Sequence, residues 1–140
     1  MIRNIITFAA AVLQMVAFAM APSAAMAQSY NGNWPATVSG TIFSNGAYCL
    51  TLSDERGSGG VLQGEASWVS DGIKWEGQFF IIDGTLMVQI FVPEGAGEIG
   101  AQVWTAHASQ GKIGSGVFGG VGGDDGKVVF GEKNGCSVSQ

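Results

Sequence analysis

Few side chains in this sequence are of a type that could act together in catalysis. There is one histidine, His107, so a metal site built from several histidines is excluded. A Ser-His-Asp arrangement would have only this one base, and no Gly-x-Ser-x-Gly motif accompanies it. We expect this lone histidine to be an ordinary residue near the end of a strand.

Two carboxylates, Glu65 and Glu76, are brought to one face by the strand pattern described below. A glycosidase needs two such groups about 5–10 Å apart in a cleft, one of them with a pKa raised by burial. Here both are expected on a solvated sheet face beside Lys74 and Gln78. The run 119–123 is glycine-rich but lacks the lysine and following helix of a phosphate-binding loop. The sequence therefore predicts a non-enzymatic protein without cofactor or metal.

The N-terminal segment has the three parts of a secretory signal peptide. Arg3 supplies the positive charge, an apolar run covers residues 5–21, and Ala25-Met26-Ala27 provides the small residues that a signal peptidase accepts. The run is about 17 residues long, which is marginal for a membrane span. We predict a signal peptide over 1–27 and one exported domain over 28–140, periplasmic or extracellular.

The charge and the cysteines fit an exported domain. Removing Arg3 leaves five Lys/Arg against eleven Asp/Glu, a net charge of −6. An acidic domain without a basic cluster is not expected to bind nucleic acid, or a membrane once the signal peptide is gone. In an oxidising compartment the pair Cys49 and Cys136 predicts one disulfide bond.

The domain consists of short β-rich runs separated by turn residues. The expected strands are 36–43, 47–53, 61–69, 73–82, 85–92, 98–108, 112–121 and 126–132. Two-residue type I′ loops are predicted at Asn45-Gly46, Asp71-Gly72 and Asp83-Gly84. Longer joints are expected at 54–60, 93–97, 109–111 and 122–125. This pattern predicts an all-β antiparallel up-and-down meander.

The two Asp-Gly turns fix the register of three strands. They place Trp68 opposite Trp75 and Ile81 opposite Leu86, and both turns put the same residues of 73–82 on one face. The opposite face is mostly polar, so the sheet has one wet side. Eight such strands close into a small barrel or, alternatively, fold into a β-sandwich. The polar outer face makes an outer-membrane barrel a poor interpretation.

The disulfide is difficult to reconcile with a strict eight-strand meander. Strand 126–132 runs in the same direction as strand 47–53, so it carries Cys136 away from Cys49. Either a strand after Gly97 is miscounted, or Asn134-Gly135 turns the tail back along the barrel. The sequence leaves both possibilities open.

Gly32-Asn33-Trp34 resembles the Gly-x-Trp motif that opens many calycin barrels, the lipocalin and avidin type. The resemblance implies the same architecture, with the tryptophan closing one end and a ligand held inside. Cys49-Leu50-Thr51-Leu52 is loosely similar to a pattern of exported bacterial metalloprotease inhibitors, which are also small barrels with one disulfide. The first resemblance favours a binding module and the second an inhibitor.

The inner face carries the candidate ligand site. The pair Trp68–Trp75 lies beside small residues and could form an aromatic pocket for an apolar or planar ligand. The predicted lining is Trp68, Trp75, Gly64, Ala66, Gly77, Phe79 and Ile90. The alternative is a filled core in which large rings cover the gaps that glycines leave.

An exposed patch is the second candidate. Phe80, Met87 and Phe91 are predicted together on the outer face, where they suit a protein partner or self-association as a homo-oligomer. The leading hypothesis is a calycin-like binding module. The alternative is a protein-interaction or protease-inhibitor domain that acts through its loops or this patch.

Overall fold

The structure, a computed structural model, describes residues 28–40, 45–91, 101–120, 123 and 125–138. The predicted signal peptide, residues 1–27, lies outside these residues. Within the described part of the chain, no helix has the length and apolar character needed to cross a membrane.

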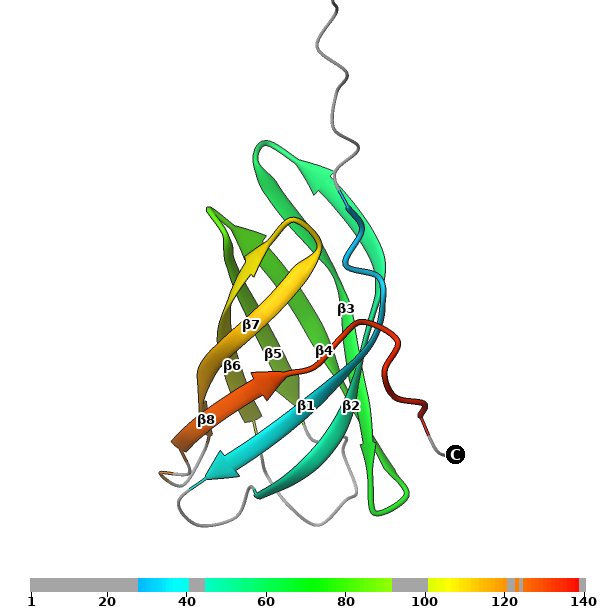
Figure 1. Ribbon diagram of the computed structural model, residues 1–140, viewed down its shortest axis with the longest axis vertical. Helices are drawn as coiled ribbons and strands as arrows, with labels where there is room; N and C mark the ends of the chain where they lie inside the picture. Colours follow the sequence, from blue (N-terminus) through cyan, green and yellow to red (C-terminus); the bar gives the residue numbers. More distant parts are fainter. Residues whose placement is uncertain (1–27, 41–44, 92–100, 121–122, 124, 139–140) are drawn as a thin grey trace, which may run out of the picture.

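Eight antiparallel strands follow one another along the described chain and close into a barrel (Figure 1). The strands are β1 (Gly32–Gly40), β2 (Asn45–Ser58), β3 (Val61–Ser70), β4 (Ile73–Ile82), β5 (Thr85–Phe91), β6 (Ala101–Ser109), β7 (Lys112–Gly120) and β8 (Asp125–Phe130). Each strand pairs with the next, and β1 also pairs with β8, so the sheet has no free edge. The meander is confirmed, and the barrel is correct rather than the sandwich.

Two-residue turns set the register of the central hairpins as predicted. Both residues of Asp71-Gly72 have positive φ, 51° and 75°, and Asp83-Gly84 has nearly the same values, 48° and 74°. This backbone matches the right-handed twist of the flanking strands. Trp68 therefore pairs with Trp75, and the whole predicted register of β3 with β4 is confirmed.

Other predicted boundaries are wrong. Asn45 and Gly46 are not a loop, because they lie inside β2 and pair with β1. The predicted joint at 54–60 is mostly strand, since β2 continues past an irregularity between Ser53 and Arg56 and turns only at Gly59-Gly60. Such a register shift, or β-bulge, lets a strand carry unpaired polar residues while its pairing with the neighbouring strand continues. The predicted joint at 93–97 lies outside the described residues.

The first strand begins four residues earlier than predicted, which places Trp34 inside β1. Its indole is 2 % exposed, and its N–H donates a hydrogen bond of 2.9 Å to the carbonyl oxygen of Tyr30. Tyr30 is also buried. Both rings are buried at the end of the barrel where β1 begins, and the buried indole keeps a partner for its polar atom.

Inward-facing side chains fill the barrel. Buried hydrophobic residues come from all eight strands, and the largest fully buried ones are Trp34, Trp104 and Phe79. Large rings alternate with small positions across the interior, which lets the layers interdigitate in a narrow barrel.

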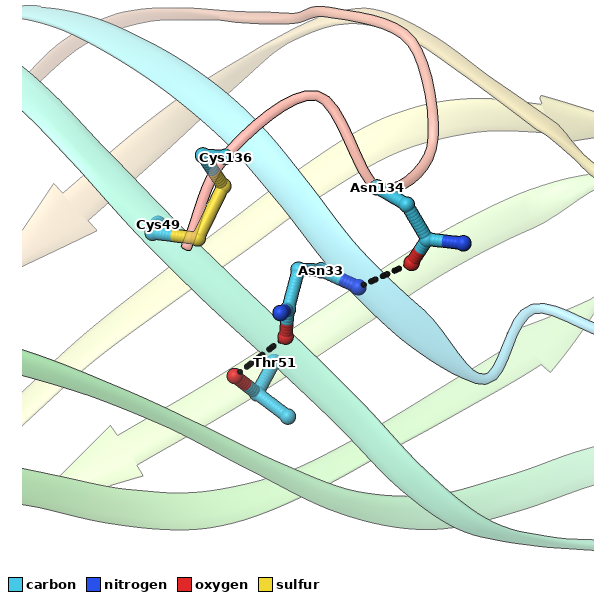
Figure 2. The surroundings of a disulfide bond; sticks show 5 residues. All are labelled: Asn33, Cys49, Thr51, Asn134 and Cys136. Atoms are coloured by element: carbon cyan, nitrogen blue, oxygen red, sulfur yellow. Dashed lines mark hydrogen bonds between the residues drawn. A yellow bond between two sulfur atoms is a disulfide. The ribbon is translucent and has the colours of Figure 1, made fainter. Parts of the chain in front are cut away.

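The disulfide is present, and the path of the tail explains it. After β8 the chain follows β1, and the N–H of Asn134 donates to the carbonyl oxygen of Asn33. Asn134 then adopts a positive φ of 62°, and the tail crosses the outer face of β1 to reach β2 (Figures 1 and 2). Cys136 bonds to Cys49 with a Cα–Cα distance of 5.8 Å. The strand count was therefore right, and the tail turns back at Asn134-Gly135.

Gly32 allows this crossing. Its φ is +146°, and a Cβ atom added there would lie 2.7 Å from Oδ1 of Asn134. The same Oδ1 accepts a hydrogen bond of 3.1 Å from the N–H of Asn33 (Figure 2). The glycine of the Gly-x-Trp tripeptide thus permits close approach of the tail, and the tryptophan packs in the interior.

Candidate functional site

Three stacked indole rings form the most distinctive arrangement inside the barrel. Trp75 stacks on Trp68 with a centroid distance of 5.6 Å, and Trp68 stacks on Trp104 at 4.7 Å. The interplanar angles are 25° and 22°, so both neighbouring rings are stacked on Trp68 with a modest tilt. The ring of Tyr48 lies to the side of Trp68 and Trp104, with centroid distances of 5.8 and 6.5 Å.

The stack begins at one end of the barrel and runs inward. Trp68 is near the end of β3 and Trp75 near the start of β4, beside the turn that joins these strands. Trp75 and Tyr48 are half-buried, whereas Trp68 and Trp104 are buried. The aromatic mouth, defined as Tyr48, Trp68, Trp75, Gln102 and Trp104, thus has an accessible outer layer and a closed inner layer.

The indole N–H groups of the aromatic mouth differ in their partners. Trp104 donates to Oε1 of Gln102 at 2.9 Å. For Trp68 and Trp75 no acceptor lies within hydrogen-bond reach among the described residues, yet no buried side-chain nitrogen or oxygen atom of these residues lacks a partner. Trp68 is 3 % exposed whereas Trp75 is half-buried, so Trp75 is the member of the stack that presents an accessible surface.

The other predicted pocket residues lie beneath the stack and pack tightly. A Cβ atom added to Gly64 would lie 2.4 Å from the ring of Phe79, so this ring occupies the space that the glycine leaves. A Cβ atom added to Gly77 would lie 1.8 Å from the carbonyl oxygen of Gln89. Ala66 and Ile90 are buried in the same core. Gly64, Ala66, Gly77, Phe79 and Ile90 thus form the floor under the stack.

Three members of the aromatic mouth were not predicted. Tyr48, Gln102 and Trp104 reach the stack through the pairing of β2 with β3 and of β5 with β6. The joint predicted before β6 is longer than a two-residue turn, so the sequence did not set the register of this strand. The signal available in the sequence was the alternation of apolar and polar residues along this strand, which places Trp104 on the inner face.

The residues predicted to form an exposed patch do lie on the outer face of the barrel. Phe80 pairs directly with Met87, and Phe91 is 57 % exposed on the same outer face of β5. We refer to Phe80, Met87 and Phe91 as the apolar patch. Further exposed apolar side chains lie near it on β4, β6 and β7: Ile82, Val103 and Val117.

The candidate catalytic groups lie apart from the aromatic mouth. Glu76 forms an exposed ion pair with Lys74, and Glu65 pairs across the sheet with Gln78. His107 is exposed at the far end of β6, opposite Thr85. The described residues contain no group of three or more His, Cys, Asp or Glu side chains that could hold a metal ion.

A hollow lies outside the barrel, on the side that the C-terminal tail crosses. Its volume is about 280 Å³, and it lies between the C-terminal tail and the outer face of β1, β2 and β3. Its lining includes Pro35, Cys49, Val69, Cys136 and Val138. None of the predicted ligand-binding residues belongs to it.

The aromatic mouth, with its half-buried Trp75 and Tyr48 over the buried Trp68 and Trp104, is the arrangement best suited to hold a small molecule. The architecture, an antiparallel closed barrel of eight strands, is compatible with a calycin-like fold. No protein-family model, curated protein or solved structure was found to match the chain.

Proposed function

We propose that the protein is an exported, non-catalytic binding module that holds a small planar, apolar ligand at its aromatic mouth. The carrying observation is that Trp75 and Trp104 both stack on Trp68, and that Trp75 is only half-buried. A flat ring can stack on the accessible part of Trp75, and Tyr48 lies beside the neighbouring Trp68. A mostly aromatic lining of this kind favours an apolar, planar ligand.

Export is part of this proposal and has two supports. The Ala25-Met26-Ala27 site follows an apolar run, and the closed disulfide Cys49–Cys136 is typical of oxidising compartments. The buried Trp34 beside a close-packed Gly32 supports a calycin-like architecture for the module.

The proposal is tested by titration with N-phenyl-1-naphthylamine, an uncharged planar probe, while tryptophan emission is followed. We expect saturable quenching of the protein's emission and a rise in probe emission. Trp75→Leu removes the outer ring, and we expect it to weaken binding at least about tenfold, which corresponds to about 1.4 kcal/mol.

Trp34→Phe is the matched control, because it replaces a buried indole outside the aromatic mouth by another ring and should leave the probe affinity unchanged. Circular dichroism checks that each variant is folded. Emission that no planar probe changes in a saturable way would refute the binding proposal, since the stack would then serve only as core.

A second candidate function, a protein-interaction or inhibitor domain, is favoured by the apolar patch. Phe80 and Met87 are cross-strand partners, and Phe91 is more than half exposed beside them. Size-exclusion chromatography of the wild type against Phe80→Ser and Phe91→Ser tests this function. If the wild type elutes as a monomer and the variants elute identically, self-association through the patch is ruled out.

A further inference from the structure

The first four described residues are held on the barrel. Tyr30 N–H donates to Oε2 of Glu55 at 2.5 Å, and Ser29 Oγ donates to the same oxygen at 3.4 Å. Glu55 N–H in turn donates to Oδ1 of Asn31, and Nζ of Lys133 donates to the carbonyl oxygen of Ser29 at 2.8 Å. Strand β2 and the C-terminal tail therefore both anchor this segment.

Gln28 also lies against the barrel, at the turn between β6 and β7. A Cβ atom added to Gly111 would lie 2.5 Å from Cβ of Gln28, so the glutamine packs on a turn that only glycine leaves open. The carboxamide of Gln28 has no hydrogen-bond partner among the described residues. The anchored segment thus extends back to the residue that follows the predicted cleavage site, and the reactive group of that residue is not engaged.

We propose that Gln28 is converted to pyroglutamate once the signal peptide is removed, a modification that rests on the export proposed above. The new α-amino nitrogen attacks Cδ of the Gln28 side chain and forms a five-membered lactam. The C–N bond of the side-chain amide breaks, and its nitrogen leaves as ammonia with the transferred proton. The reaction needs no oxidant, reductant or other co-reactant.

Charged groups of both signs hold the segment next to Gln28. Lys133 places an ammonium group on the carbonyl oxygen of Ser29, and the carboxylate of Glu55 accepts from Tyr30 and Ser29. The lactam replaces an α-amino group, which titrates at about 7.7–8.0, by a neutral amide.

The lactam would protect the fold from its N-terminal end. Aminopeptidases require a free α-amine, and trimming would proceed from Gln28 towards Tyr30, whose carbonyl oxygen holds the buried indole of Trp34. A blocked first residue therefore preserves the packing at that end of the barrel.

The test is the intact mass of the full-length gene product purified after export, together with N-terminal sequencing. We expect the mass of residues 28–140 less one ammonia and the two hydrogens of the disulfide, and a chain blocked to Edman degradation. Gln28→Ala is the matched control, because it removes the side-chain amide but keeps Ala25-Met26-Ala27 and the hydrogen bonds of Ser29 and Tyr30. This variant should yield a readable N-terminus.

The outcomes separate the two proposals. A chain that starts at Gln28 with a free amine after prolonged incubation at neutral pH contradicts the modification and leaves export intact. A chain that still starts at Met1, or starts elsewhere, contradicts the predicted cleavage and the modification together. Treatment with an aminopeptidase adds a second readout, since only the Gln28→Ala variant should be shortened.

Discussion

At the scale of single residues, glycines determine how closely neighbouring strands approach in this barrel. A Cβ atom added to Gly77 or Gly116 would lie 1.8 Å from a carbonyl oxygen of the adjoining strand. Such a distance cannot be relieved by rotating a side chain, because the obstacle is backbone. These positions therefore require glycine for close packing and not for turn formation.

Gly77→Ala is expected to lower the free energy of unfolding by about 2–4 kcal/mol, because β5 must move away from β4 to admit the methyl group. Urea denaturation followed by tryptophan emission measures the change. Gly119→Ala is the control, since no atom lies within 4 Å of the added Cβ. It should change stability by less than about 0.5 kcal/mol, and equal effects in both variants would show that close approach at Gly77 is not required.

At the scale of elements, the C-terminal tail acts as a strap across β1. It is held at one point by the backbone of Asn33 and at another by the disulfide from Cys136 to Cys49, which are 87 residues apart in sequence. Strand β8 ends at Phe130, so the tail adds contacts to β1 after the ladder itself has ended.

Replacing both cysteines, Cys49→Ser with Cys136→Ser, is expected to lower the free energy of unfolding by about 4–5 kcal/mol in the chain-entropy model. Chemical denaturation gives this value. Hydrogen exchange should show that the amide of Asn134 loses protection under native conditions, whereas amides of β3 and β4 keep theirs. If the amide of Asn134 stays as protected as in the wild type, the strap does not depend on the disulfide.

At the scale of the whole molecule, an acidic domain carries an uncharged outer region. The predicted mature chain has a net charge of −6, whereas the outward residues of β5 are Thr85, Met87, Gln89 and Phe91. Net charge of one sign opposes association of like molecules, and salt screens this repulsion while leaving apolar contact intact.

Self-association through the apolar patch is therefore expected to increase with ionic strength. Sedimentation velocity at about 0.02 M and about 0.5 M salt, where the Debye length falls several-fold, measures the change. Phe91→Ser should abolish the increase. Val129→Ser should not, because Val129 is equally exposed, at 54 % against 57 %, but lies on β8 away from the patch. An increase that survives Phe91→Ser would place the contact elsewhere.

The sequence by itself determined the features that depend on local conformation. The Asp-Gly turns at 71–72 and 83–84 have the positive φ values that their types favour, and they set the register from β3 to β5. Alternation along these strands also separated the inner pair Trp68–Trp75 from the outer apolar patch, because side chains on a strand alternate strictly between faces.

Only the tertiary structure decided the features that join distant parts of the chain. No local signal brings Trp104 to Trp68, pairs β1 with β8, or returns Cys136 to Cys49. Each depends on strand register across a long connection or on the path of the tail after the last strand. A long connection permits several pairings, and closure of the whole barrel selects one of them. The stack and the strap are for this reason products of barrel closure.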